Sequence, residues 1–255
     1  MKIIRLPDEG EQKILQVEAD WRVVSADYDD TVSAYSHVRI PGFRPGKVPQ
    51  RVIEQRLQKQ IIEDLSNRSA QRLGREALRE AGAESLGPIE IENIECGKGK
   101  PFSFTARFHP MPDIVLPDLG ALNINDDGSD PRDQISHRLL VIVTFAIPDE
   151  FVKAEIGIND GDADNGSDAW KAAEERVRLM LILKRIAKQE GIEVSESDVD
   201  RRIKDKALEF GTSADALRSE LEEGGGRRRL KDMLLAESTL DYLTEIITHK
   251  KGGQS

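Results

Sequence analysis

The sequence predicts an α+β domain followed by an all-α domain, in a chain that is elongated overall. Apolar residues alternate with polar ones in parts of the first half, as in half-buried strands, and recur at helical spacing in the second half. Charged residues make up 33% of the 255 residues and aromatic residues only 5%. This composition gives a large surface for a modest apolar interior, so it favours an elongated or multi-lobed shape over one compact globule.

Two segments of the first half have the period-two pattern of a strand. Apolar residues occupy every second position in the segments 15–19 and 102–108. A run of glycine and lysine, 97–100, separates the second of these from another alternating segment, 89–92. The segments on either side of this run are therefore predicted to pair as a hairpin.

A helical region lies between the first strand and the hairpin. Pro49 suits the first turn of a helix, and Gly82 suits a helix end. Between them an apolar stripe recurs at helical spacing, comprising Ile53, Leu57, Ile61, Leu65, Leu73, Ala77 and Ala81. We expect one face of these helices to cover one face of the sheet, as in other α+β domains.

The second half has the pattern of a helical domain. One long amphipathic helix is predicted from about Trp170 to Gly191, and Ser195 with Asp198 resembles a capping box at the start of the next helix. Gly211 fits the position just after that helix. The stripe predicted to be buried on it consists of Val199, Ile203, Ala207 and Phe210.

A short helix and a long one are predicted to follow. The short helix contains Leu217 and Leu221 and ends at the glycines 224–226. The long helix begins at about Arg227, and its apolar side comprises Leu230, Met233, Leu240, Leu243 and Ile247. The tail 249–255 is predicted to be disordered.

The net charge of −10 arises in the middle of the chain. The segments 1–112 and 171–255 each contain 17 basic and 17 acidic residues, whereas 113–170 contains 3 basic and 13 acidic ones. This middle part includes a run of turn-forming residues without an apolar anchor, which indicates a linker. We therefore expect an α+β domain at 1–116, a linker at 117–130, a helical domain at 131–248 and a disordered tail at 249–255.

The composition also limits the classes of function. Cys96 is the only cysteine, so an intrachain disulfide is excluded and a reducing compartment is expected. The sequence has neither a secretory signal nor an apolar run that could span a bilayer, and we expect a soluble, cytoplasmic protein without a membrane partner. We predict no catalytic residue, metal site or cofactor, because no metal-ligand spacing relates Cys96 to the four histidines, His37, His109, His137 and His249.

The segment 40–49 carries the clearest functional signal. Its three prolines and two glycines exclude regular structure and make the loop stiff. Phe43 is difficult to bury in so short a loop, and Arg44 and Lys47 flank it. The surrounding segment 39–79 contains 10 basic and 4 acidic residues. Such a loop suits docking on RNA or on an acidic protein surface.

The run Gly42-Phe43-Arg44-Pro45-Gly46-Lys47-Val48-Pro49 resembles the ribosome-docking signature of bacterial trigger factor, Gly-Phe-Arg-x-Gly-Lys-x-Pro, at every fixed position. The place of Pro45 is often Lys in that family, so one docking cation is absent here. The order of strand, helix–loop–helix and hairpin looks like the family's N-terminal domain. The segments 147–152 and 199–243 look like the start and the arm helices of its C-terminal domain. Only the acidic linker occupies the place of the family's peptidyl-prolyl isomerase domain.

This resemblance implies an N-terminal domain of the ribosome-binding type, a C-terminal domain with helical arms, and an ATP-independent chaperone that is not an enzyme. The loop would dock on ribosomal protein and rRNA near the exit tunnel through Gly42, Phe43, Arg44, Pro45, Gly46 and Lys47. The helical domain would bind nascent or unfolded polypeptide, and free protein could form a homodimer. Three alternatives stay open: a ribosome-independent holdase or assembly chaperone, an RNA-binding regulator and a prolyl isomerase.

Three further motifs have simpler explanations. The spacing of Gly42, Gly46 and Lys47 is one residue short of a phosphate-binding loop, and no Ser or Thr follows for the metal. The acidic segment 160–168 lacks the Gly and Glu of a calcium loop, so we expect a solvated linker, with weak cation binding left open. The arginines 227–229 are expected to pair with Glu220, Glu222 and Glu223 rather than to contact RNA.

Overall fold

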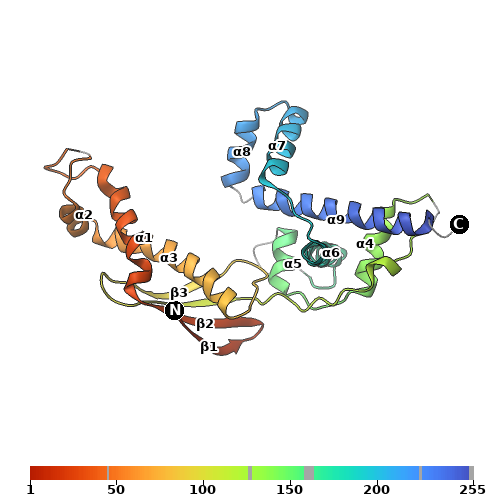
Figure 1. Ribbon diagram of the computed structural model, residues 1–255, viewed down its shortest axis with the longest axis horizontal. Coiled ribbons are helices and arrows are strands. Elements are labelled where there is room, and N and C mark those ends of the chain that lie inside the picture. The colour runs from red at the N-terminus through yellow and green to blue at the C-terminus, as the bar shows by residue number, and fades with distance from the viewer. Residues whose placement is uncertain (45, 126–127, 158–163, 224–225, 253–255) are drawn as a thin grey trace. The chain divides into compact units, whose positions relative to one another are not determined.

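The computed structural model describes residues 1–44, 46–125, 128–157, 164–223 and 226–252 (Figure 1). The chain divides into two compact units, Met1–Met111 and Pro112–Ser255. The first unit combines a sheet with helices, and the described part of the second is helical. The predicted fold class, α+β followed by all-α, is confirmed.

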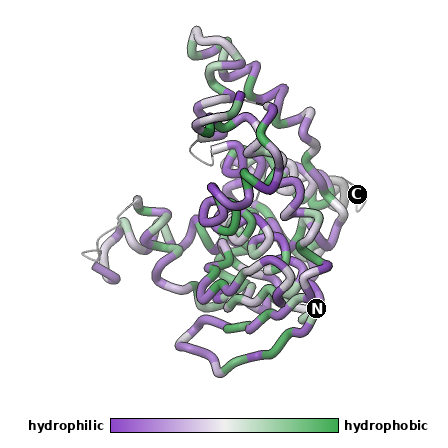
Figure 2. Tube along the Cα trace, turned by 90° about the vertical axis from the view of Figure 1, so that its left-hand side faces the viewer, coloured by the Kyte–Doolittle hydropathy of each residue, from purple (hydrophilic) through white to green (hydrophobic). Residues whose placement is uncertain are grey.

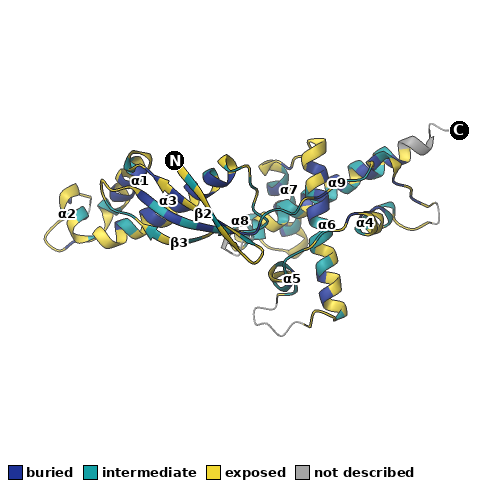
Figure 3. Cartoon of the chain, turned by 90° about the horizontal axis from the view of Figure 1, so that it is seen from below, coloured by how far each residue is buried: buried dark blue, intermediate teal, exposed yellow. Residues whose placement is uncertain are grey.

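The sheet of the first unit has four antiparallel strands in the order β1-β2-β4-β3. The predicted strand at 15–19 and the predicted hairpin are confirmed as β2 and as the β3–β4 pair. Half of the residues of β2 are buried (Figure 3), because the strand lies between two others and one of its faces packs beneath a helix. The strands are β1 (Lys2–Glu9), β2 (Gln12–Ala19), β3 (Glu90–Glu95) and β4 (Phe102–Phe108).

Helix α3 (Gln58–Glu80) covers one face of this sheet, as the apolar stripe predicted. Its apolar side chains pack on those of β2 and β4 in one buried cluster, which includes Leu15, Val17, Ala70, Leu73, Ala77, Phe102 and Phe104. The helix ends before Gly82, whose φ is 65°. The sequence thus predicted both the packing of this helix on the sheet and the position where the helix ends.

Helices α1 (Trp21–Ala34) and α2 (Gln50–Arg56) complete the first unit. A 3-10 helix, η1 (Tyr35–His37), and the loop 38–49 connect them. The helical region after Pro49 is interrupted at Leu57, whose φ of −119° separates α2 from α3. These helices and the loop form a second apolar cluster, comprising Tyr28, Val32, Ile40, Val48, Ile53, Ile61 and Leu65.

The second unit contains six α-helices in its described residues. Helices α6 and α9 pack against each other, α5 packs on α6, and α4 contacts both α6 and α9. Helices α7 and α8 form a pair that contacts the beginning of α9 (Figure 1). The six are α4 (Pro131–Ile142), α5 (Asp149–Ile156), α6 (Asp168–Glu190), α7 (Glu196–Phe210), α8 (Ala214–Glu223) and α9 (Gly226–Gly252).

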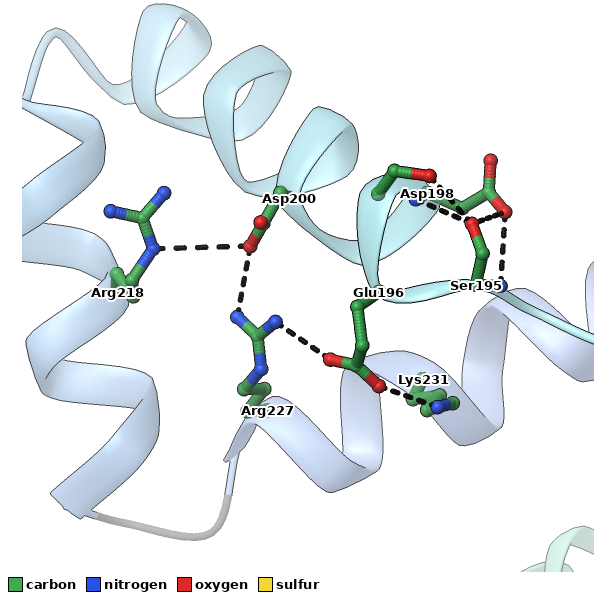
Figure 4. Close-up of polar contacts among 8 residues, drawn as sticks. Ser195, Glu196, Asp198, Asp200, Arg218, Arg227 and Lys231 are labelled. Carbon is green, nitrogen blue, oxygen red and sulfur yellow. Dashed lines mark hydrogen bonds and ion pairs between the residues drawn. The ribbon is translucent and has the colours of Figure 1, made fainter.

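The predicted capping box at the start of α7 is confirmed. The Ser195 hydroxyl oxygen accepts a hydrogen bond from the Asp198 backbone N–H at 3.2 Å, and Asp198 Oδ2 accepts one from the Ser195 backbone N–H at 3.0 Å (Figure 4). Both N–H groups at this helix start are therefore satisfied. Gly211 caps the other end of α7, and Gly191 caps α6, as predicted.

Phe210 departs from the predicted buried stripe of α7. Its side chain is 70% exposed, whereas Val199, Ile203 and Ala207 are buried. Phe210 is the last residue of α7, and Gly211 turns the chain directly after it, so the packed face does not continue around its ring.

Among the side chains that the structure describes, Arg227 pairs with α7 and not with Glu220 or Glu222 of α8, contrary to the prediction. Its guanidinium lies 2.8 Å from Glu196 Oε2 and 3.1 Å from Asp200 Oδ1, both on α7 (Figure 4). Lys231 of α9 lies 2.6 Å from the other oxygen of Glu196. Glu196 and Asp200 are one helical turn apart and present their carboxylates on the same side of α7, which brings both to α9.

The segments predicted as linker and tail both contain helical residues. Within 117–130, the 3-10 helix η2 (Leu119–Ala121) contacts α9, and three apolar side chains attach this segment to the second unit: Leu119, Leu122 and Ile124. At the other end, α9 continues to Gly252, because the helix propagates from the buried residues Leu243 and Ile247. Residues 249–252 are therefore helical, and 253–255 lie outside the described residues.

Candidate functional site

The loop 38–49 is held at both sides by buried apolar residues. Ile40 is 4% exposed and Val48 is also buried, and both belong to the cluster formed with α1, α2 and α3. Burial of these two side chains fixes where the loop leaves and rejoins the unit. Figure 1 shows the loop and α2 together at one end of the first unit, away from the sheet.

Backbone hydrogen bonds and two glycines shape the tip of this loop. The Phe43 N–H donates to the Ile40 carbonyl at 3.1 Å, and the Gly46 N–H donates to the Ser36 carbonyl at 3.0 Å. Gly42 and Gly46 have φ angles of 91° and 78°, which residues with a side chain rarely adopt. The tip therefore has a defined backbone, in agreement with the stiffness that its prolines and glycines predicted.

The side chains at the tip are directed to solvent. Phe43 is 41% exposed, and Arg44 and Lys47 are exposed as well. Within the described ranges, neither cation has a carboxylate partner. Pro45 lies outside the described residues. Three of the predicted docking side chains thus lie on one exposed tip, where an aromatic ring and two positive charges are free to contact a partner.

The acidic groups near the loop are engaged elsewhere. Glu54 of α2 lies 2.9 Å from the ammonium of Lys98, whose hydrogen bond holds the pKa of Glu54 below its ordinary value. The Tyr35 hydroxyl donates to Asp64 at 2.5 Å, and this hydrogen bond raises the pKa of Tyr35. Because these carboxylates have internal partners, they do not neutralise the cations of the loop.

No catalytic centre is evident among the residues that the structure describes. They contain no group of three His, Cys, Asp or Glu side chains placed to hold a metal ion. Cys96 is half-buried, and burial raises the pKa of its thiol, which disfavours the nucleophilic thiolate. Residues 160–163 of the acidic segment that was considered for cations, including Asp160 and Asp162, lie outside the described residues.

The second unit exposes several large apolar side chains that sequence periodicity did not reveal. Leu208 is 81% exposed and, with Phe210, lies at the end of α7. The others are Val115, Val141 and Ile142, the last two at the end of α4, and Met233 on α9. Figure 2 shows hydrophobic residues in short stretches between hydrophilic ones in both units. No helix in the described ranges is long and apolar enough to cross a membrane.

A cavity of about 360 Å³ lies between α7 and α9, but its lining is mainly charged. Asp198, Arg201, Arg202, Glu237 and Asp241 all contribute to it. Most of these charges are already paired: the Arg202 guanidinium, for example, lies 2.6 Å from Glu237 Oε2. The exposed apolar side chains, rather than this cavity, are therefore the candidate contacts for an unfolded chain.

Comparison with known proteins identifies both units. A family model described as bacterial trigger factor protein matches residues 1–134, and one described as the C-terminus of that protein matches residues 159–245. The trigger factor of Rhodococcus erythropolis is 33% identical over 129 residues, which are 49% of this chain and 28% of that protein. The trigger factor of Opitutus terrae is 33% identical over 112 residues, 44% of this chain and 26% of that protein. The aligned parts thus span only about a quarter to a third of these relatives.

The fold agrees with these matches. A solved structure described as "Promiscuous Substrate Recognition in Folding and Assembly Activities of the Trigger Factor Chaperone" aligns with 97% of this chain and 100% of that one. The TM-score is 0.50 and the sequence identity 12%, so the likeness is one of fold. Together with the family model that covers more than half of the sequence, these findings show that the chain belongs to the bacterial trigger factor family.

Proposed function

We propose that this protein is an ATP-independent chaperone that docks on the ribosome near the exit tunnel and holds nascent or unfolded polypeptide. Docking uses Gly42, Phe43, Arg44, Pro45, Gly46 and Lys47, and holding uses the helical unit. One observation supports the proposal most strongly: Phe43 is exposed on a loop whose ends are buried, beside two cations that have no carboxylate partner among the described residues. In this role the protein works in the cytoplasm and needs no cofactor.

The geometry of the tip suits a docking contact. Little conformational entropy is left for the loop to lose, because its ends are buried and its backbone is hydrogen-bonded. The Phe43 ring provides apolar contact area for ribosomal protein. Arg44 and Lys47 provide charge for acidic side chains or rRNA phosphates. Such a contact combines packing with electrostatic attraction, which speeds association.

The helical unit supplies the second half of the proposed function. Its exposed apolar side chains include residues at the ends of α4 and α7 and on α9, and each can bind an apolar residue of a client weakly. Several weak contacts with one flexible chain combine by avidity, while each contact alone stays reversible. Leu208 and Phe210, at the end of α7, provide two of these anchors and are 81% and 70% exposed.

We infer that the chain has no prolyl isomerase activity. Only residues 135–158 lie between the two matched family regions, and these include the end of α4 and all of α5. A segment of this length is too short for a further folded domain, which requires about 50 residues or more. A protease-coupled isomerisation assay with a proline peptide is expected to show only the uncatalysed rate.

Sedimentation of ribosomes with the full chain tests the docking proposal. The variant Phe43→Ala/Arg44→Ala removes the aromatic ring and one cation of the tip, and it is expected to stay in the supernatant at physiological salt. The matched control is Phe210→Ala/Lys206→Ala, which removes another exposed aromatic ring and a cation, 5.9 Å from that ring, from the helical unit. This control is expected to sediment like the wild type.

Suppression of aggregation of a chemically unfolded client is the reciprocal measurement. The control variant is expected to suppress aggregation less effectively than the wild type. The loop variant is expected to suppress aggregation as effectively as the wild type.

If both variants sediment with ribosomes like the wild type, the docking proposal is wrong and a ribosome-independent holdase becomes the better explanation. Nuclease-sensitive complexes without ribosomes would favour an RNA-binding regulator. Sedimentation equilibrium of the free protein tests the predicted homodimer.

A further inference from the structure

Four cations outside the docking signature lie at the same end of the first unit. Arg39 precedes the tip of the loop, Arg51 and Arg56 lie on α2, and Lys59 lies in the first turn of α3. All four side chains are exposed. We call these four residues the α2 patch. Figure 3 shows α2 and the neighbouring loop as a mostly exposed part of the unit.

The α2 patch has no internal counter-charge. In the described chain, none of its four cations has an ion-pair partner. Glu54 is the one acidic residue between Arg39 and Lys59 in the sequence, and it is bound by Lys98. Arg44 and Lys47 on the adjacent tip are also unpaired, so positive charge accumulates at this end of a protein whose net charge is −10.

The placement of two of these cations opposes helix stability. Arg51 and Lys59 lie in the first turns of α2 and α3, where the positive end of the helix dipole disfavours a cation. Neither helix has an acidic residue in its first turn, the position where acidic residues would be favourable. Packing does not account for the cations either, because their side chains are exposed. Binding of an anionic partner accounts both for the exposure of these cations and for their unfavourable position at the helix starts.

We propose that the α2 patch binds the phosphodiester backbone of RNA next to the docking loop. The inference rests on the proposed docking function and names further residues, outside the loop, that contact RNA at the same end of the unit. Three of the four cations are arginines, whose guanidinium groups can donate two parallel hydrogen bonds to a phosphate. Phe43 is the one exposed aromatic residue among those described in this unit, so the patch lacks a platform for stacking bases. The contact is therefore independent of sequence and sensitive to salt.

Anisotropy of a labelled RNA hairpin of arbitrary sequence, titrated with the full chain at several salt concentrations, tests this inference. The test variant is Arg51→Ala/Arg56→Ala. The matched control, Arg75→Ala/Arg79→Ala, removes two exposed arginines from α3 and changes the net charge equally. We expect the test variant to bind more weakly and to reduce the slope of log K against log salt by about 2, one per lost phosphate contact. The control is expected to keep the wild-type slope.

Any of three outcomes would overturn the inference. Equal losses in both variants would mean that only net charge matters, and competition by polyglutamate as strong as that by RNA would point to an acidic protein partner. Ribosome sedimentation separates this inference from the proposed function. Suppose that Phe43→Ala/Arg44→Ala fails to sediment with ribosomes, while Arg51→Ala/Arg56→Ala keeps the wild-type slope of log K against log salt. The docking proposal is then supported, and the proposal that the α2 patch binds RNA is wrong. Unchanged melting temperatures of both arginine variants exclude unfolding as the cause of any loss.

Discussion

The Lys98 ammonium lies 2.9 Å from Glu54 Oε1 and so connects the loop between β3 and β4 to helix α2. The same ammonium lies 5.1 Å from the centroid of the Tyr28 ring, on α1. One side chain from the loop between β3 and β4 therefore contacts both helices that flank the docking loop. This contact holds α2 in place and at the same time removes the only carboxylate of α2 from the surface charge.

We predict that Lys98→Ala lowers the free energy of unfolding by about 0.5–1 kcal/mol at about pH 7, because it removes an ion pair and a cation–π contact. The pKa of Glu54 is lowered in the folded state, mainly by its hydrogen bond to Lys98. The contribution of the pair is therefore complete above the ordinary carboxyl pKa of 4.5 and is lost as the pH falls through the lowered value. Chemical denaturation at about pH 7 and about pH 3 measures this difference.

Lys100→Ala is the control for this prediction. Lys100 is exposed in the same hairpin loop, and the structure, as far as it describes the chain, shows no carboxylate bound to it. A loss of stability in Lys98→Ala that is equal at both pH values would contradict the role of Glu54.

The second prediction separates the anchor of the docking loop from its tip. Ile40→Ala is expected to lower the free energy of unfolding by about 2–4 kcal/mol, because it leaves a cavity in a buried cluster. Phe43→Ala is expected to change it by less than about 0.5 kcal/mol, because its ring packs on no buried cluster. Urea denaturation of the two variants measures both values. Comparable losses would mean that Phe43 serves the fold rather than a partner.

Much of the fold could be predicted because the spacing of apolar residues along the sequence indicates which face of a strand or helix is buried. The alternation in 102–108 and the stripe from Leu65 to Ala77 each matched the face that packs in the sheet–helix layer. β1 was missed because it lies at the edge of the sheet and is mostly exposed, so its sequence does not alternate. Phe210 was placed in the core because periodicity does not show where the covering helices end.

The exposed tip of the candidate site could be predicted, because proline, glycine and one aromatic residue leave few alternatives for a short loop. The partners of individual charges could not. Lys98 and Glu54 are 44 residues apart, and Arg227 and Glu196 are 31 apart, so only the fold brings them together. The net charge of the segment 39–79 was visible in the sequence, but which of its cations are unpaired depends on those distant contacts.

Loss of the capping box gives the third prediction. Ser195→Ala is expected to destabilise the second unit by about 1 kcal/mol, because the Asp198 N–H loses its side-chain acceptor at the start of α7. Ser195→Thr retains a hydroxyl and is expected to restore most of the loss. Thermal melting of both variants measures the difference. A Thr variant as unstable as the Ala variant would show that packing around Ser195, rather than the cap, is responsible.

The fourth prediction concerns how the α7–α8 pair is held on α9. Arg227 bridges Glu196 and Asp200, and Lys231 binds the same Glu196, so α9 contacts α7 through charges at the surface of the pair (Figure 4). Among the described residues, the apolar cluster beneath them is small: its buried members are Val194, Val199, Ile203 and Leu234. In Arg227→Ala, amide hydrogens in the first turns of α7 are expected to exchange roughly two- to fivefold faster than in the wild type at low salt. The effect is small because exposed ion pairs contribute little to stability. High salt screens these pairs, so the wild type should approach the variant as salt is raised. Arg229→Ala, on the same turn of α9 but exposed, should exchange like the wild type throughout. If both arginine variants exchange alike, the apolar cluster alone holds α7 on α9.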